Sequence, residues 1–245
     1  YDQSTNTWSG VTEDKTNAYN ASRVARMKEL HDAIRTVKPD AYFINEDLAG
    51  AKEENEMSED NETNWANINN ASCQFAMGWQ SGSNLNRFYA PLDDNRIWGS
   101  TVSYSESHDE ERMAYKCEQW GNTGIKGNVA MTMRRLGSVA AMMLMSPGAH
   151  MIWQFQEFGA DQTTKNESGN DTSPKRVIWS YLDDEYHAGL KDSYAALCAI
   201  RAKNPDMFGS DVTTSVNTLY ASSTYGNIVL TKGDREIVLV VNPNT

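Results

Sequence analysis

Residues 101–112 read Thr-Val-Ser-Tyr-Ser-Glu-Ser-His-Asp-Glu-Glu-Arg, a short run suited to a strand that passes directly into charged residues. We predict a strand over residues 101–105. The same order occurs earlier, where Ala41-Tyr-Phe-Ile44 is followed by Asn45, Glu46 and Asp47. Further short strands are predicted over residues 65–69 and 150–155. In two places, therefore, acidic side chains begin where a predicted strand ends.

Predicted helices alternate with these strands. Over residues 21–37, apolar side chains recur every three or four positions and Asn20 is placed to cap the first turn. The same kind of pattern predicts helices over residues 71–79, 128–145 and 185–203. Strands that alternate with helices indicate a parallel sheet. The acidic, Asn-rich segment from residue 50 to 64 is predicted to be an exposed loop or a frayed helix.

The pattern changes after Pro205. Residues 227–231 and 236–241 alternate with period two around a turn at 232–235, which predicts an antiparallel hairpin in a separate module. Only four strand–helix units precede it, whereas a closed (β/α) barrel needs eight. A parallel sheet with an open edge and a bare face would invite aggregation. We therefore expect the chain to be a segment of a longer protein.

The composition excludes several classes of function. The 245 residues carry a net charge of −11 and a pI near 4.8. Such an acidic chain is poorly suited to bind nucleic acid or an anionic membrane surface. The longest apolar run, residues 139–145, is far shorter than a membrane span, so we expect no transmembrane segment.

The charged residues at the strand ends admit two interpretations. Parallel strands present their carboxyl ends on one face, so acids from two strands would meet in one cleft, as acid–base work on acetals requires. Alternatively, Ser107-His-Asp-Glu110 fits a capping box, Glu46 fits a solvated loop acid, and His108 fits a structural histidine. Spacing alone does not decide between them.

The exact order of residues in these segments is more specific than their spacing. Residues 102–116, centred on Glu-Ser-His-Asp-Glu-Glu-Arg112, resemble the seventh-strand motif of the α-amylase family, glycoside hydrolase family 13, in the form common in Bacteroidetes-type members. Residues 21–46 resemble the fourth helix and fifth strand, and residues 146–159 the eighth strand with its loop. This resemblance implies that residues 1–205 form the second half of a (β/α)8 TIM barrel. Residues 206–245 would begin an antiparallel C-terminal β-sandwich domain.

The resemblance also implies roles for individual residues. Glu46 would be the general acid and base, Asp109 the carboxylate that stabilises an oxocarbenium-like transition state, and His108 a ligand of sugar hydroxyls. The nucleophilic aspartate of the family would lie upstream of residue 1, because residues 1–7 are similar to the region that follows it; Asp2 is given no role. Most calcium ligands would also lie upstream, so no cofactor or complete metal site is expected in this segment.

The function implied is retaining hydrolysis of α-1,4-glucans such as starch, glycogen or malto-oligosaccharides, with the upstream half of the polypeptide completing the barrel. A transglycosylase such as a branching enzyme would use the same acids, and a non-catalytic glucan-binding barrel is the alternative from another class. The resemblance suggests a bacterial protein that is secreted, periplasmic or on the cell surface. Several tryptophans are candidates for stacking on sugars, whereas Trp153, inside a predicted strand, is expected in the core.

Overall fold

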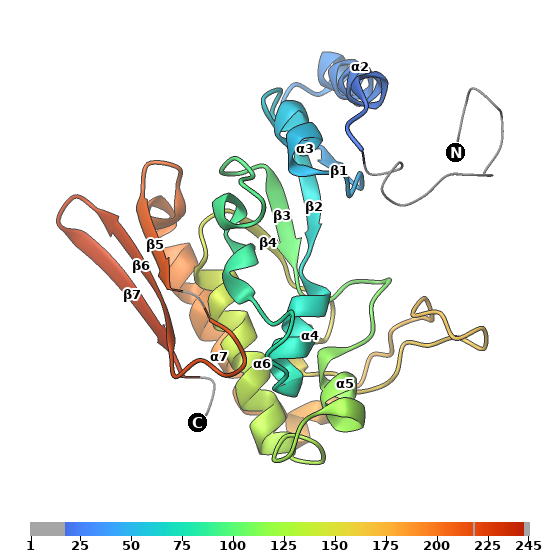
Figure 1. The fold of residues 1–245 in the computed structure, drawn as a ribbon, viewed down its shortest axis with the longest axis vertical. Helices are drawn as coiled ribbons and strands as arrows, with labels where there is room; N and C mark the ends of the chain where they lie inside the picture. Colours follow the sequence, from blue (N-terminus) through green and yellow to red (C-terminus); the bar gives the residue numbers. More distant parts are fainter. Residues whose placement is uncertain (1–17, 218, 243–245) are drawn as a thin grey trace.

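The predicted parallel sheet is present in the computed structural model, which describes residues 18–217 and 219–242. Its strands lie in the order β1 (Ile44–Asn45), β2 (Thr63–Asn67), β3 (Thr101–Tyr104) and β4 (Ala149–Met151), and every neighbouring pair is parallel. The carboxyl ends of all four strands therefore lie at the same edge (Figure 1). Residues 1–7, which the family resemblance places just after the upstream nucleophile, lie outside the described residues.

All four strands differ from their predicted bounds, although β3 ends only one residue early, at Tyr104. The strand predicted over 41–44 is only Ile44–Asn45, and that predicted over 65–69 begins two residues earlier, at Thr63. The strand predicted over 150–155 ends at Met151. The apolar run continues beyond β4, but the backbone turns away at Phe155, which has a left-handed φ of 60°. Apolar composition alone did not reveal this turn.

The helices agree better with the sequence pattern. They are α2 (Ala21–Val37), α3 (Ala51–Ser58), α4 (Asn69–Met77), α5 (Met113–Trp120), α6 (Val129–Met145) and α7 (Glu185–Lys203). Asn20 caps α2 as predicted, its side-chain oxygen accepting the N–H groups of Ser22 and Arg23 at 3.0 and 3.2 Å. Short 3-10 segments complete the set: η1 (Leu85–Phe88), η2 (Ala90–Leu92), η3 (Gln156–Phe158), η4 (Trp179–Asp183) and η5 (Pro205–Phe208).

Residues 50–64, predicted as an exposed loop or a frayed helix, are the largest local error because much of the segment is buried. This segment forms α3 and the start of β2, and the side chains of Glu53 and Glu54 are buried. Arginines from other segments make this burial possible, since Arg23 bonds Glu53 and Arg96 bonds Glu54 at 2.6 Å. A buried carboxylate is tolerated when a cation and hydrogen bonds compensate it.

Helix α6 connects the two parts of the molecule. It packs against α4, α5, α7 and β7, and its side chains Leu136 and Met142 are fully buried. The predicted hairpin is present as β6 (Gly226–Lys232) and β7 (Arg235–Val241), joined by a third strand, β5 (Thr213–Asn217), that the polar sequence did not reveal. Figure 1 shows this antiparallel sheet beside α6 and α7. One hydrophobic cluster includes residues from both parts. Among the helices of the described residues, none is long and apolar enough to cross a membrane.

Candidate active site

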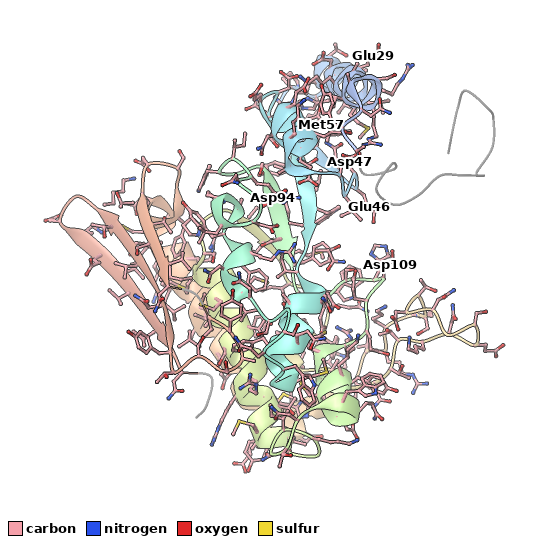
Figure 2. The ribbon with its side chains drawn as sticks, viewed as in Figure 1. Glu29, Glu46, Asp47, Met57, Asp94 and Asp109 are labelled. Atoms are coloured by element: carbon pink, nitrogen blue, oxygen red, sulfur yellow. The ribbon has the colours of Figure 1, made fainter. Side chains whose placement is uncertain are left out.

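Two strand ends bring the predicted residues together. Glu46 directly follows β1, and His108 and Asp109 lie in the turn that follows β3. One carboxylate oxygen from each acid and one ring nitrogen of His108 all lie within 4.8 Å of one another, and all three residues are exposed. Figure 2 labels Glu46 and Asp109 on the two loops that approach each other there. The convergence predicted from the parallel sheet is thus present.

The turn after β3 is not a helix cap. Helix α5 begins only at Met113, with Arg112 at its N-cap position, so the capping box considered for Ser107–Glu110 is wrong. The Ser107 hydroxyl instead contacts the Glu110 carboxylate and accepts the Asp109 N–H at 3.2 Å. Glu110 also accepts a hydrogen bond from Asn67 at 2.5 Å. These contacts close a non-helical turn that carries His108 and Asp109 outward.

A buried ion pair supports the base of this turn. Arg112 donates to the Glu106 carboxylate at 2.6 Å, and both residues are 2% exposed. The other Glu106 oxygen accepts the Met113 N–H at 2.8 Å, while Arg112 also donates to the Gln154 carbonyl. Burial raises the pKa of Glu106, and the Arg112 charge acts in the opposite direction. The first and last residues of the string, Glu106 and Arg112, therefore have a structural role, whereas His108 and Asp109 at its centre face the solvent.

Tyr104, the last residue of β3, was not recognised from the sequence. It is 7% exposed, and its ring meets Trp65 edge-on with the ring centres 5.7 Å apart. Burial raises the pKa of Tyr104 to about 12, and the charges of Glu110 and Glu46 raise it further. The phenol therefore stays protonated beside the acids at neutral pH. Its place near the end of a predicted strand was the sequence feature that could have indicated a residue of the site.

Trp153 was predicted in the core and is found at this site. It lies beyond the end of β4, half-buried, with its ring centre 6.0 Å from that of His108. Its indole N–H is buried and has no hydrogen-bond partner among the described residues. Phe155, two residues on, has φ 60°, and Leu48, two residues after Glu46, has φ 52°. Left-handed backbone at non-glycine residues is strained and is frequent beside functional sites.

The residue after Glu46 is anchored in the protein. The Asp47 side chain is 6% exposed and lies 3.2 Å from the Arg23 guanidinium. Its pKa is raised to about 6, chiefly by burial and by the charge of Glu53, while Arg23 opposes the shift. Asp47 thus points into the protein and the neighbouring Glu46 points out. This alternation fixes the direction of Glu46 relative to α3.

The three converging groups are also a possible metal-ligand set, so we tested their fit to calcium. Calcium takes six to eight oxygen ligands. Two exposed carboxylates and one imidazole provide too few oxygens, so this set does not fit calcium. We derive no step through a metal here.

A groove on another part of the molecule was also considered as a binding site. It has a volume of about 600 Å³ and runs between α6, α7 and the end of β7. Its walls are mostly small and apolar, including Gly137, Ala141 and Gly189, with Arg134 and Glu185 as charged members. It lacks the paired acids and histidine, and we therefore place the candidate site at the strand ends.

Solved structures share this fold. An α-amylase from H. orenii has 15% identity and a TM-score of 0.61, covering 91% of this chain and 47% of its own. A pullulanase from Paenibacillus barengoltzii, in complex with maltohexaose and α-cyclodextrin, has 14% identity and a TM-score of 0.65, covering 90% and 39%. A cyclic α-maltosyl-(1→6)-maltose hydrolase from Arthrobacter globiformis has 18% identity and a TM-score of 0.60, covering 89% and 46%.

At these identities the similarity establishes the fold. The chain spans less than half the length of these three structures and matches part of their α/β barrel and the β-sheet that follows. The predicted fold, half of a barrel followed by an antiparallel sheet, is confirmed. No protein-family model matches the chain, and no curated protein sequence matches it either.

Proposed function

We propose that this chain belongs to the α-amylase family, glycoside hydrolase family 13, as a Bacteroidetes-type member, and carries part of the active site of a retaining α-glucan hydrolase. The convergence of Glu46, His108 and Asp109 within 4.8 Å supports this proposal most directly. These side chains come from two separate strand ends of a parallel sheet. A pair of solvated surface acids would not need a histidine and a tryptophan ring beside it.

Each residue has a defined task in this proposal. Glu46 gives its proton to the glycosidic oxygen as the bond to the anomeric carbon breaks, and a carboxylate nucleophile takes that carbon. Glu46 then removes a proton from water, which attacks the glycosyl-enzyme and frees the nucleophile. Asp109 stabilises the positive charge that develops on the sugar ring, and His108 binds a sugar hydroxyl. The nucleophile is proposed in the upstream half of the same polypeptide.

The proposed substrates are α-1,4-linked glucans such as starch, glycogen and malto-oligosaccharides. Two structures with the same fold are named as an α-amylase and a cyclic α-maltosyl-(1→6)-maltose hydrolase, and the third, a pullulanase, is in complex with maltohexaose and α-cyclodextrin. The half-buried Trp153 beside His108 supports a sugar ligand, because an aromatic ring can cover the apolar face of a pyranose.

Two further expectations remain proposals. Calcium, if used, would bind in the upstream half, since the ligand set found here does not fit it. We also propose export to the periplasm, the cell surface or the medium of a bacterium, because starch, one of the proposed substrates, is too large to enter a cell before it is cleaved. The roles proposed for Glu46 and Asp109 depend neither on calcium nor on export.

The test uses the complete polypeptide with Glu46→Gln and Asp109→Asn. Each should lower the release of reducing ends from amylose by about 100-fold or more, because each removes a group acting in the transition state. Glu29→Gln and Asp94→Asn change exposed acids that lie away from Glu46 and Asp109 in Figure 2, and both should leave activity unchanged. Near-normal turnover by either site variant would overturn the assignment.

The same assay separates the alternatives. A hydrolase lowers iodine staining of amylose and releases a matching number of reducing ends. A branching enzyme changes the staining without that release. A glucan-binding barrel without catalysis would change neither, and its binding would survive both substitutions.

A further inference from the structure

The side chain of Asp109 has little to hold it directly. It is 52% exposed, the His108 ring lies 3.5 Å away, and the Glu46 carboxylate lies within 4.8 Å. Its own N–H is held by the Ser107 hydroxyl. The direction of the carboxylate therefore depends on the backbone of the turn rather than on bonds to the carboxylate itself.

One loop holds the backbone on both sides of Asp109. The loop of residues 161–176, which follows η3, donates from Lys175 Nζ to the carbonyl of His108 at 2.5 Å. It also donates from Thr164 Oγ1 to the carbonyl of Glu110 at 3.2 Å. The carbonyls immediately before and after Asp109 are thus bonded to the same loop, from two positions that lie eleven residues apart.

Glu111 attaches the loop more firmly. This residue is 2% exposed, and its carboxylate accepts the Thr164 N–H at 2.9 Å and the Thr163 hydroxyl at 2.7 Å. The Thr164 hydroxyl lies 3.0 Å from the same carboxylate, so its single proton is shared between Glu111 and the Glu110 carbonyl. It also accepts the Arg112 N–H at 3.0 Å. With three full donors and one shared donor the buried carboxylate is well satisfied, and bonds to a charged acceptor are stronger than neutral ones.

Lys175 is held in turn. Its ammonium also donates to the Asp171 carbonyl at 2.8 Å. Burial and the nearby charge of Arg112 lower the pKa of Lys175, while Asp171, Glu111 and Glu110 act in the opposite direction. The loop and the turn therefore form one hydrogen-bonded unit, with Thr164 and Lys175 as its two points of attachment around Asp109.

We propose that Glu111, Thr164 and Lys175 are positioning residues that hold Asp109 in its catalytic orientation through the carbonyls of His108 and Glu110. The inference rests on the proposed function and extends it to residues outside the reacting groups. Errors of about 1 Å in a catalytic group can cost about 100-fold in rate, so loss of an attachment should reduce turnover.

The test compares matched variants of the complete polypeptide. Lys175→Met removes an attachment. Lys165→Met removes a lysine of the same loop whose ammonium, among the described residues, bonds Gly169 and Asp171 of that loop and no other segment. Thr164→Val removes the hydroxyl, and Thr164→Ser keeps it. We expect Lys175→Met and Thr164→Val to lower kcat by about 10- to 100-fold with KM changed by less than about threefold. Lys165→Met and Thr164→Ser should retain near-normal kcat.

A double-mutant cycle separates positioning from general structural damage. In an Asp109→Asn background, Thr164→Val should cause little further loss of kcat, because the residue it positions is already disabled. An equal loss in both backgrounds would overturn the inference, and so would normal kcat for Thr164→Val. If Asp109→Asn alone keeps full activity, the proposed function has failed instead. Should Thr164→Val not fold, Lys175→Met is carried through the same cycle.

Discussion

The imidazole ring of His108 lies 6.0 Å from the indole ring of Trp153, with an angle of 50° between the ring planes. The two residues follow different strands, β3 and β4, and meet because these strands are parallel neighbours. The acids and an aromatic surface consequently occupy the same edge of the sheet. Four predictions follow from this site and the groups that support it.

Trp153 should contribute to substrate binding. Trp153→Ala should raise KM for malto-oligosaccharides by about 3- to 10-fold, since a ring contact contributes roughly 0.5–1.5 kcal/mol. Trp153→Phe should retain most of the affinity. The exposed Trp120, which packs against Tyr115 on α5, provides a control in Trp120→Phe. An unchanged KM in Trp153→Ala would show that the ring does not touch the substrate.

Asp47 should destabilise the folded protein at neutral pH. Its pKa is about 6 in the folded state against 3.8 for an ordinary aspartate. Folding therefore favours the protonated form, and this stability is present below about pH 4 and lost as the pH rises through 6. Asp47→Asn should raise the free energy of unfolding at pH 7.5 by on the order of 1–3 kcal/mol, with a smaller effect at pH 4.

Urea unfolding of both proteins at these two pH values measures the effect. Asp94→Asn, an exposed substitution, is the control and should show the same small change at both. A lower stability of Asp47→Asn at pH 7.5 would mean that its ion pair with Arg23 outweighs the cost of burial.

His150 should have the opposite pH dependence. Its Nε2–H donates to the Ser146 carbonyl at 2.8 Å, which leaves Nδ1 to accept from the Ser103 hydroxyl at 2.7 Å. Burial lowers the pKa of His150 to about 4. Because the folded state favours the neutral ring, stability is present above pH 6.5 and is lost as the pH falls toward 4. The NMR signal of the ring, assigned with His150→Gln, should show no titration above about pH 5; a midpoint near 6.5 would contradict this.

The ion pair beneath the turn should be important for stability. Arg112→Met leaves the Glu106 carboxylate buried without its cation and should cost roughly 3–5 kcal/mol in the free energy of unfolding. The double variant Glu106→Gln/Arg112→Met should cost less than the single one, because no uncompensated charge remains. Arg26→Met, which breaks an exposed pair with Glu29, should have little effect. Equal small losses in all three would show that the buried pair has no special role.

The sequence predicted best where local signals agreed with tertiary packing. Helices α6 and α7 combine a side-chain cap, from Asn128 and Asp184, with regular apolar spacing, so both boundaries could be predicted closely. The convergence of Glu46 with Asp109 was predictable because parallel strands share one edge. The helix bounds depend on signals within a short segment, and the convergence of the acids depends on the order of the strands.

The errors concern interactions between distant residues. The segment of α3 was predicted as an exposed loop or a frayed helix because its acids look solvated, and Arg23 and Arg96 permit their burial. Trp153 belongs to an apolar run, and nothing in that run indicates the left-handed turn at Phe155. The role of Glu111 depends on Thr164, which lies 53 residues away and could not be paired with it from the sequence.

The far end of the 161–176 loop is held by its own bonds. Asn166 donates to the Asn170 carbonyl at 2.8 Å, Gly169 donates back to Asn166 at 2.9 Å, and the Asn166 side chain accepts two more N–H groups. This tip makes a closed turn, whereas Thr164 and Lys175 are tied to the turn of Asp109. Residues 167–169 are therefore a position where evolution or an engineer can lengthen the chain or graft a binding peptide while the acids keep their places.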